Sequence, residues 1–482
     1  MNEDARALAA DVCRRTMRRD RLPAVSVCVV DRDGVVYADG FGSRDLAGNR
    51  PATPDTLYGV GSVTKSVTAL ALAQLRDAGM LDFDDPVSTH LDVDLGGDDD
   101  DPVRLHHLLS HSSGLPSLGT SEALIGRRLR RATDTIALAS RDDFRAHVEG
   151  AAARGERVGA PGERFAYSNE GYVLLGDVVE ACTGRSYDRY VEEHVLDPLD
   201  LDRATFEDAA FAMDDDHATM YLHEEGDVVA ASVPTRELSR PAGGLLASVA
   251  ELGRFLRLFL NEGTLDGREV VAPDSVAALT APRVDTPSGP YGYGWRTRES
   301  CGRELVGHSG SIAVSSAYAG FCPDEGVGVA VAANSAPDYP LVRLGEAVFA
   351  CALGEDPAEV VPFVERRRRF DRLTGEYAAY RGAKRAYVAR DGDALRLQLV
   401  GPLGGESFPL VASDDPYTFH TPNEAGEPVP VEFRVGEDTG TTAGDGDDGS
   451  GAGRPRTRGP AVDLLYDRWH LHKVADEAVG RE

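Results

Sequence analysis

The stretch that decides the fold is 62-SVTKSVTALALAQLRDAG-79. Its apolar residues recur at helical spacing and fall roughly on one face: Val63, Val67, Leu70 and Leu75. Gly79 is a typical residue just past a helix C-terminus, so the pattern predicts a helix that begins near Ser62 and stops there. Because positions i and i+3 share a face of a helix, the Ser62 hydroxyl and the Lys65 amine are expected to converge.

Ser62 and Lys65 have the chemistry of a nucleophile and its base. The first turn of a helix is its positive end, which favours a developing alkoxide on Ser62. A serine nucleophile needs a partner that removes its proton, and a lysine does so when burial or a neighbouring cation lowers its pKa. The chain has three lysines among 51 basic residues, so 51 − 3 = 48 are arginine. Arginine cannot lose its proton at workable pH, so lysine here favours a base. The alternative is a serine cap followed by an ordinary helix lysine.

A second candidate is the run Tyr167-Ser168-Asn169, which precedes the helical segment GYVLLGDVVEACTG. A tyrosine close to a cationic lysine becomes partly phenolate and shares the work of a general base. The Asn169 amide has an oxygen that accepts from Lys65 and an NH₂ that donates to a substrate carbonyl. A surface loop is the alternative interpretation of this run.

The third candidate is His308-Ser309-Gly310-Ser311, which is expected to open a strand run over 311–321. A glycine at a strand edge allows a ligand to approach the backbone closely. The N–H of Ser311 and that of Ser62 would then form an oxyanion hole.

These motifs in this order resemble the serine beta-lactamase-like superfamily, in the branch of class C beta-lactamases, DD-peptidases and related esterases. Such enzymes carry S-x-x-K, then Y-x-N, then K-T-G or a variant. Here the three are S-V-T-K at 62, Y-S-N at 167 and H-S-G at 308. Further stretches that resemble the family are 55–65, 105-LHHLLSHSSGLP-116, 161–176, 242–256 and 291–295.

The resemblance implies a role for each of these residues. Ser62 would be acylated, Lys65 and Tyr167 would share proton transfer, and water would release the acyl group without a cofactor. The substrate-binding residues would be Asn169, His308, Ser309, Gly310 and Ser311.

This chain departs from the family at His308, where lactamases and many DD-peptidases carry a lysine that binds a substrate carboxylate. Histidine, with a reference pKa of about 6.5, is mostly neutral near pH 7. We therefore expect a small-molecule ester, amide or short peptide as substrate, cleaved by an esterase-like or D-amino-acid peptidase-like enzyme. The alternatives are a true beta-lactamase or DD-carboxypeptidase, and a non-catalytic ligand-binding homologue.

The first 355 residues predict an α+β domain, because strands lie at both ends and helices between them. The expected architecture is a mixed antiparallel sheet flanked by helices plus an all-helical lobe. The predicted strands are 24–30, 35–42, 293–298, 313–321 and 327–334, and the helical parts are 2–19, 62–79, 105–260 and 340–353.

After a linker predicted over 356–372, the pattern of the sequence changes. Residues 373–482 contain short strand-like runs separated by Gly, Asp and Pro, which predicts a small antiparallel β-barrel. This part resembles the lipocalin-like barrel appended to some members of the superfamily. Within it, 437–460 is a low-complexity stretch and is predicted to be a disordered loop.

Charge narrows the classes of partner. The chain of 482 residues carries 51 Lys and Arg against 80 Asp and Glu, a net charge of −29. This balance argues against nucleic acid and against an anionic membrane as partners. Abundant acid with almost no lysine predicts a halophilic protein, since at about 1 M salt the Debye length is about 3 Å and self-repulsion is screened.

The expected cellular compartment follows from features that the sequence lacks. The first 20 residues have no 7–15-residue apolar stretch, and no window approaches 18 uncharged apolar residues, so neither a signal peptide nor a membrane span is expected. Six cysteines lie far apart without a C-x-x-C pair, which predicts buried thiols in a reducing compartment. We expect a cytoplasmic protein, and the oligomeric state stays open.

Three other patterns are interpreted as structural. The sequence 307-GHSGS-311 begins like a nucleophile elbow, but its fifth residue is Ser and a strand follows. The histidines at 106, 107 and 111 are expected around the end of a helix that stops at Gly114. His470 and His472 alternate on one strand face, but the sequence offers no third ligand, so no metal is expected.

Overall fold

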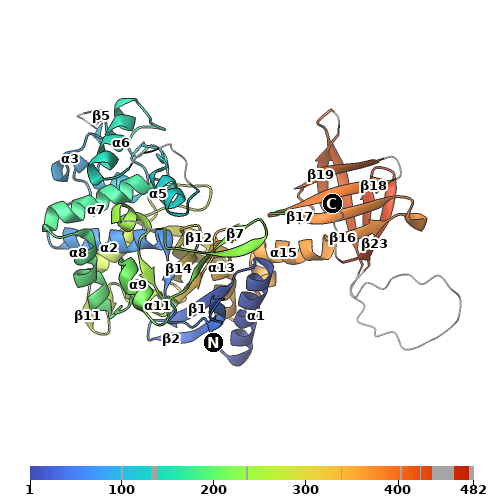
Figure 1. Ribbon diagram of the computed structural model, residues 1–482, viewed down its shortest axis with the longest axis horizontal. Coiled ribbons are helices and arrows are strands. Elements are labelled where there is room, and N and C mark those ends of the chain that lie inside the picture. The colour runs from blue at the N-terminus through green and yellow to red at the C-terminus, as the bar shows by residue number, and fades with distance from the viewer. Residues whose placement is uncertain are drawn as a thin grey trace. The chain divides into compact units, whose positions relative to one another are not determined.

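The computed structural model describes residues 1–98, 101–131, 136, 138–234, 237–337, 339–401, 404–423, 425–436 and 461–476. The chain folds into two compact units, Met1–Val361 and Pro362–Glu482 (Figure 1). The loop that the sequence predicts over 437–460 lies outside the described residues.

The first unit is built on a seven-stranded antiparallel sheet with the order β12-β13-β14-β15-β1-β2-β3. β1 pairs with β15 along its length, for example Val27 with Val331, so the sheet joins the two ends of this unit. This confirms the predicted α+β class. The strands are β1 (Ala24–Asp31), β2 (Val35–Asp45), β3 (Arg50–Pro51), β12 (Arg296–Ser300), β13 (Arg303–Ser311), β14 (Ser316–Cys322) and β15 (Val327–Ala333).

Helices cover both faces of this sheet. Val27 and Val29 of β1 pack in one core with residues of α1 (Glu3–Arg19) and α13 (Val342–Ala352). Cys28 and Val30 belong to a second core with α11 (Val249–Leu260). Because both faces are covered, β1 is buried at seven successive positions.

Most of the remaining helices form a mainly helical lobe that also carries short strands, whereas α14 (Pro357–Val360) packs on α13. The α-helices are α2 (Thr64–Asp77), α3 (Val87–His90), α4 (Leu105–Leu109), α5 (Thr120–Arg128), α6 (Arg141–Ala153), α7 (Asn169–Thr183), α8 (Tyr187–Val191), α9 (Asp208–Met213), α10 (Arg240–Gly243), α12 (Pro273–Thr280) and α14 (Pro357–Val360). The shorter helical turns are η1 (Gly61–Val63), η2 (Glu192–Leu196), η3 (Asp197–Leu199) and η4 (Glu237–Ser239). The short strands are β4 (Tyr58–Gly59), β5 (Gly97–Asp98), β6 (Asp101–Pro102), β7 (Met220–Glu224), β8 (Asp227–Ala231), β9 (Leu246–Ala247), β10 (Thr264–Leu265) and β11 (Arg268–Glu269).

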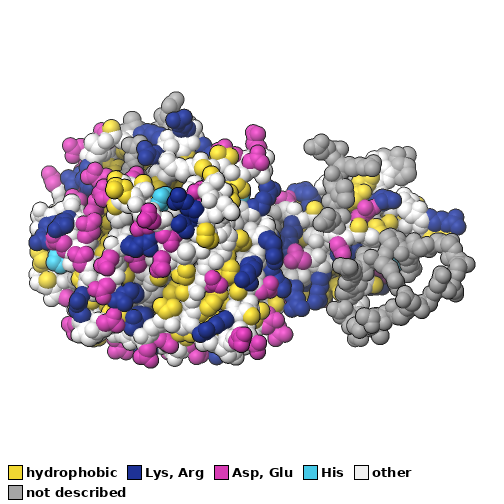
Figure 2. All heavy atoms as spheres, turned by 60° about the horizontal axis from the view of Figure 1, so that its bottom comes forward, with side chains coloured by type: hydrophobic (Ala, Val, Ile, Leu, Met, Phe, Trp, Pro, Cys, Tyr) yellow, Lys and Arg dark blue, Asp and Glu magenta, His cyan; other side chains and the backbone are white. Residues whose placement is uncertain are grey.

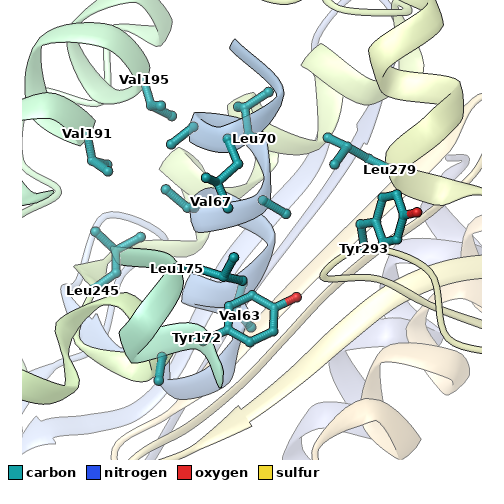
Figure 3. Close-up of a cluster of buried hydrophobic side chains, with 14 of the residues drawn as sticks. Val63, Val67, Leu70, Tyr172, Leu175, Val191, Val195, Leu245, Leu279 and Tyr293 are labelled. Atoms are coloured by element: carbon teal, nitrogen blue, oxygen red, sulfur yellow. The ribbon is translucent and has the colours of Figure 1, made fainter. Parts of the chain in front are cut away.

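Helix α2 lies in the middle of the largest core. All of its residues from Thr64 to Ala73 are buried, so it packs on every side rather than on one face. Figure 3 shows Val63, Val67 and Leu70 of this segment among side chains from other elements. The polar side chains of Lys65 and Ser66 are therefore buried inside the unit, away from solvent.

The second unit is a closed barrel of eight antiparallel strands, as predicted, in which β16 pairs with β23. Helix α15 (Pro362–Leu373) adds Phe370 and Leu373 to the barrel core, so much of the predicted linker is helical. The remaining elements are β16 (Gly375–Ala378), η5 (Tyr380–Gly382), β17 (Arg385–Asp391), β18 (Ala394–Gly401), β19 (Gly404–Ala412), β20 (Thr418–Pro422), β21 (Pro428–Val435), β22 (Val462–Tyr466) and β23 (Trp469–Ala475).

Acidic and arginine side chains are interspersed over the visible surface of the first unit (Figure 2). Cys13, Cys28, Cys322 and Cys351 are buried thiols, whereas Cys182 and Cys301 are partly exposed, and all six are free. Among the described helices, none combines the length and the apolar character needed to cross a membrane.

Candidate active site

Ser62 lies on a tight turn at the head of α2. It belongs to the 3₁₀ turn Gly61–Val63, and the α-helix itself begins at Thr64, two residues later than the sequence predicts. Gly61 has φ +55°, and a Cβ there would lie 2.6 Å from the Ser311 nitrogen, so both conformation and space require glycine. The turn is closed by the Thr64 hydroxyl, which donates to the Gly61 carbonyl at 2.7 Å.

Lys65 is fully buried and its amine lies at the centre of a small polar cluster. Its Nζ lies 3.1 Å from Ser62 Oγ, 2.7 Å from Asn169 Oδ1 and 2.6 Å from the Ala242 carbonyl. A neutral amine keeps two N–H groups, which the Asn169 and Ala242 oxygens accept, and its lone pair is then left for the Ser62 hydroxyl proton. The geometry therefore suits a base that faces Ser62.

The electrostatics favour this neutral form. Burial lowers the pKa of Lys65 to about 7, although the negative charges of Glu170 and Glu122 oppose the shift. Desolvation penalises the charged ammonium, and no carboxylate forms an ion pair with Lys65 among the described residues. Near neutral pH a substantial fraction of Lys65 is uncharged.

Tyr167 and Asn169 reach the cluster from the start of α7. Ser168 is the N-cap of this helix and its Oγ accepts from the Gly171 N–H at 3.3 Å, so the residues on either side of the cap are held in place. The Tyr167 hydroxyl is hydrogen-bonded to the Ser62 side chain. The structure thus brings Ser62, Lys65, Tyr167 and Asn169 together.

A partly ionised Tyr167, as expected from the sequence, does not fit the structure. Burial raises the pKa of Tyr167 well above its usual range. The Lys65 nitrogen lies over the Tyr167 ring, 5.0 Å from its centroid, rather than against the phenol oxygen. The phenol therefore stays protonated and is suited to relay a proton rather than to act as an anionic base.

His308 closes a strand instead of opening one, which corrects the sequence interpretation. It lies in β13 (Arg303–Ser311), and the Ile312 N–H donates to the Ser315 carbonyl in the turn before β14. This strand escaped prediction because its run RELVGHSGS lacks a clean alternation of apolar and polar residues.

His308 is a neutral, internally paired side chain. Its Nδ1 lies 2.7 Å from the Ser309 carbonyl, which only accepts, so Nδ1 carries the proton. Nε2 then accepts from the Tyr291 hydroxyl at 2.9 Å. Burial, with the nearby charge of Lys65, lowers the pKa of His308 to about 3. His308 therefore does not supply the positive charge that a lysine would give at this position.

The backbone of residues 309–311 lies directly against the turn that carries Ser62. A Cβ on Gly310 would lie 2.0 Å from the Val60 carbonyl oxygen and 2.6 Å from the Ser62 nitrogen. This close approach brings the backbone of Gly310 and Ser311 against the backbone of the Ser62 turn.

A cavity of about 370 Å³ opens onto Ser62, Asn169 and Ser311. Its walls are largely apolar, and the one acidic residue among those that line it is Glu122 on α5. Its basic residue, Arg131, is paired with Glu224 at 2.9 Å. The apolar side chains in the lining include Ile125, Leu129, Leu222 and Ile312.

His111 was not predicted from the sequence as a site residue and was interpreted only as part of a helix end. His111 is buried, its carbonyl accepts from Ala166, and its Nδ1 accepts from the Ser168 N–H at 3.1 Å. Its ring lies 4.2 Å from that of Tyr167. His111 therefore supports the segment that bears Tyr167, and its signal in the sequence was its place in the 105–116 stretch.

Arg296 on β12, which contacts aromatic residues near the site, was also not singled out from the sequence. It lies over the rings of Phe165 and Tyr291, 5.3 Å from each centroid, and donates to the Gly289 carbonyl. It does not line the cavity that contains Ser62. In the part of the chain that the structure describes, no three metal-ligating side chains meet near Ser62.

A family model described as Beta-lactamase matches residues 9–349, and one described as Pab87 octamerisation domain matches residues 357–443. The structure is similar to that of the octameric penicillin-binding protein homologue from Pyrococcus abyssi, with 31% identity, 96% of this chain and 99% of that chain covered, and a TM-score of 0.83.

Two further relatives match about 70% of the chain. A D-stereospecific amidohydrolase from Streptomyces sp. is 27% identical, with 71% of this chain and 98% of that chain covered and a TM-score of 0.59. Protein flp from Staphylococcus aureus is 26% identical over 70% of this chain, and the match spans 65% of the length of that protein. Since the family model covers most of the chain, from residue 9 to residue 349, the chain belongs to the beta-lactamase family.

Proposed function

We propose that the protein is a serine hydrolase that cleaves an ester or amide through an acyl-enzyme on Ser62. The observation that carries this proposal is the 3.1 Å contact between Ser62 Oγ and the buried amine of Lys65. Lys65 takes the hydroxyl proton as Oγ bonds to the substrate carbonyl carbon, and the amides of Ser62 and Ser311 stabilise the oxyanion.

The second half of the reaction uses the same groups. The proton held by Lys65 passes, through the Tyr167 hydroxyl, to the leaving alcohol or amine as its bond to the carbonyl carbon breaks. Water then attacks the acyl-enzyme and gives up a proton to Lys65. The acid is released and Ser62 regains its proton. Asn169 holds the Lys65 amine and the substrate carbonyl in place.

The substrate class we infer is a D-aminoacyl amide, ester or short peptide with a free amine. The similarity to a D-stereospecific amidohydrolase supports a D-aminoacyl group as the acyl part of the substrate. Glu122 supports a free amine on the substrate, because it is the acidic side chain of the cavity lining and the basic one, Arg131, is paired with Glu224. A true beta-lactamase or DD-carboxypeptidase would need a cation for the substrate carboxylate, and neutral His308 does not provide one.

A substrate panel tests the proposal. We expect the full chain, assayed in molar potassium chloride, to hydrolyse chromogenic esters and D-aminoacyl anilides, and Ser62→Ala to lose this turnover. Intact-mass spectrometry should detect an acyl adduct on the wild type only. Equal rates for Ser62→Ala and wild type would refute the proposal. Hydrolysis of a cephalosporin, or a penicilloyl adduct on Ser62 after incubation with a penicillin, would instead favour the beta-lactamase alternative.

Removing the charge of Glu122 should change selectivity rather than chemistry. We expect Glu122→Gln to lower kcat/KM about tenfold or more for a D-aminoacyl anilide with a free amine, and to leave that for its N-acetyl counterpart nearly unchanged, because only the first carries an ammonium. Glu156→Gln, at an exposed position outside this cavity, is the control. An unchanged ratio of the two substrates in Glu122→Gln would contradict the inferred role.

We also propose that the chain assembles into a homo-oligomer through its second unit and works in a salt-rich cytoplasm. The match of residues 357–443 to an octamerisation domain and the similarity to an octameric homologue support assembly. The net charge of −29 supports the high-salt setting, and six free cysteines support the reducing compartment.

A further inference from the structure

The hairpin formed by β22 and β23 carries three side chains that the mechanism above does not use. Asp463 of β22 lies opposite His472 in the strand register, and Leu465 lies opposite His470. Leu464 and Leu471 point into the barrel core, so residues at alternate positions, including these three, lie on the outer face. The sequence showed the two histidines on one face but offered no third ligand; the strand pairing supplies it.

The three side chains converge closely. His470 Nε2 lies 3.0 Å from Asp463 Oδ2, and His472 Nδ1 lies 2.8 Å from Oδ1. One ligand atom from each residue falls within 4.8 Å of the other two. In a tetrahedral zinc site with bonds of about 2.0 Å, ligand atoms are about 3.3 Å apart. Side-chain rotations that part the carboxylate from each imidazole and bring the two imidazoles to that spacing admit an ion.

Within the described part of the chain, the three side chains are partly exposed to solvent. The two histidine side chains are each 53% exposed and that of Asp463 is 30% exposed. On the far side of His472 the neighbouring strand presents Ala378, which is small. Arg434 lies opposite Asp463 on β21, but its guanidinium is held by Glu432 at 2.7 Å.

From this geometry we infer that Asp463, His470 and His472 form a binding site for a divalent transition metal ion, with Zn²⁺ as the probe. Two imidazoles and one carboxylate are a donor set that suits zinc, copper, nickel and iron, whereas calcium and magnesium prefer oxygen ligands alone. Three protein ligands leave further coordination positions for water. The ion would link β22 to β23, next to the pairing of β23 with β16 that closes the barrel.

Calorimetric titration of the chelator-treated full chain with zinc chloride at pH 7.5 tests the inference. We expect one zinc per chain with a micromolar or lower Kd, at least a tenfold rise of Kd in Asp463→Asn, and no such site in the double variant His470→Asn, His472→Asn. His420→Asn, which changes a histidine on β20 outside the cluster, is the matched control and should bind like the wild type. No saturable binding to the wild type, or unchanged binding to the double variant, would overturn the inference.

A second measurement needs no variant. Cobalt(II) added to the wild-type chain should give the visible bands of a nitrogen and oxygen donor set, and zinc should displace it. The cysteine thiols are the competing ligands, and a strong thiolate-to-cobalt charge-transfer band at one cobalt per chain would assign the ion to them and overturn the inference.

Discussion

Lys65→Arg should lower kcat/KM for ester hydrolysis about a thousandfold, because a permanently charged guanidinium replaces an amine that can be neutral. Arginine cannot give up its proton, so no lone pair faces Ser62 Oγ at any workable pH. Lys65→Met, which has no amine and less bulk, should lose a similar factor. Lys384→Arg makes the same chemical change in the barrel and should leave the rate unchanged. If Lys65→Arg kept most of the activity, lysine would not be the base.

The pH profile of the wild type checks the same role independently. The amine acts as a base only when it is uncharged, and its pKa is about 7 in the folded protein. We therefore expect kcat/KM to rise with pH through about 7 and to level off above it. Lys65→Met should lack this step in whatever activity remains. A rise that begins only near pH 10, the range of an ordinary lysine, would contradict the neutral base.

Gly310→Ala should have the second large effect. Its new methyl group would lie 2.0 Å from the Val60 carbonyl oxygen, so the turn that carries Ser62 must move. Displacing an oxyanion-hole amide costs about 10²–10³ in kcat, and the overpacking should lower the free energy of unfolding by about 1–3 kcal/mol. Ester kinetics and thermal unfolding in high salt measure the two effects.

Gly34→Ala is the matched control for that substitution. Gly34 lies between two strands of the same sheet, its φ is not in the left-handed region, and nothing lies within 4 Å of an added Cβ. We expect wild-type kinetics and a nearly unchanged melting temperature. A Gly310→Ala variant that behaved like Gly34→Ala would contradict the close packing of residues 309–311 on the Ser62 turn.

Elements with a strong local pattern were predicted well from the sequence. The runs AVSVCVV and VGVAVAAN became β1 and β15, and the helix that follows Ser62 became α2. The barrel was recognisable because its strands are short, alternating and separated by turn residues. β13 was missed because its residues have mixed character, and its place beside β12 and β14 comes from pairing rather than from local preference.

In the candidate site, too, local features were predictable from the sequence and features that depend on packing were not. The spacing of Ser62 and Lys65 on one helix turn is a local property, and the rarity of lysine singled it out. The protonation state of Tyr167 was misjudged because it depends on burial, which spacing does not reveal. His111 was overlooked because its contact with Tyr167 joins residues 56 positions apart in the chain.

The sequence alone determined which residue types stand at helical or strand spacing, and hence the candidate nucleophile, its neighbour along the helix and the class of fold. Only the tertiary structure decided that Lys65 is enclosed and close to neutral, that residues 309–311 touch the Ser62 turn, and that Asp463 meets two histidines. The physical reason is that desolvation and close contact depend on segments distant in the chain, which packing alone brings together.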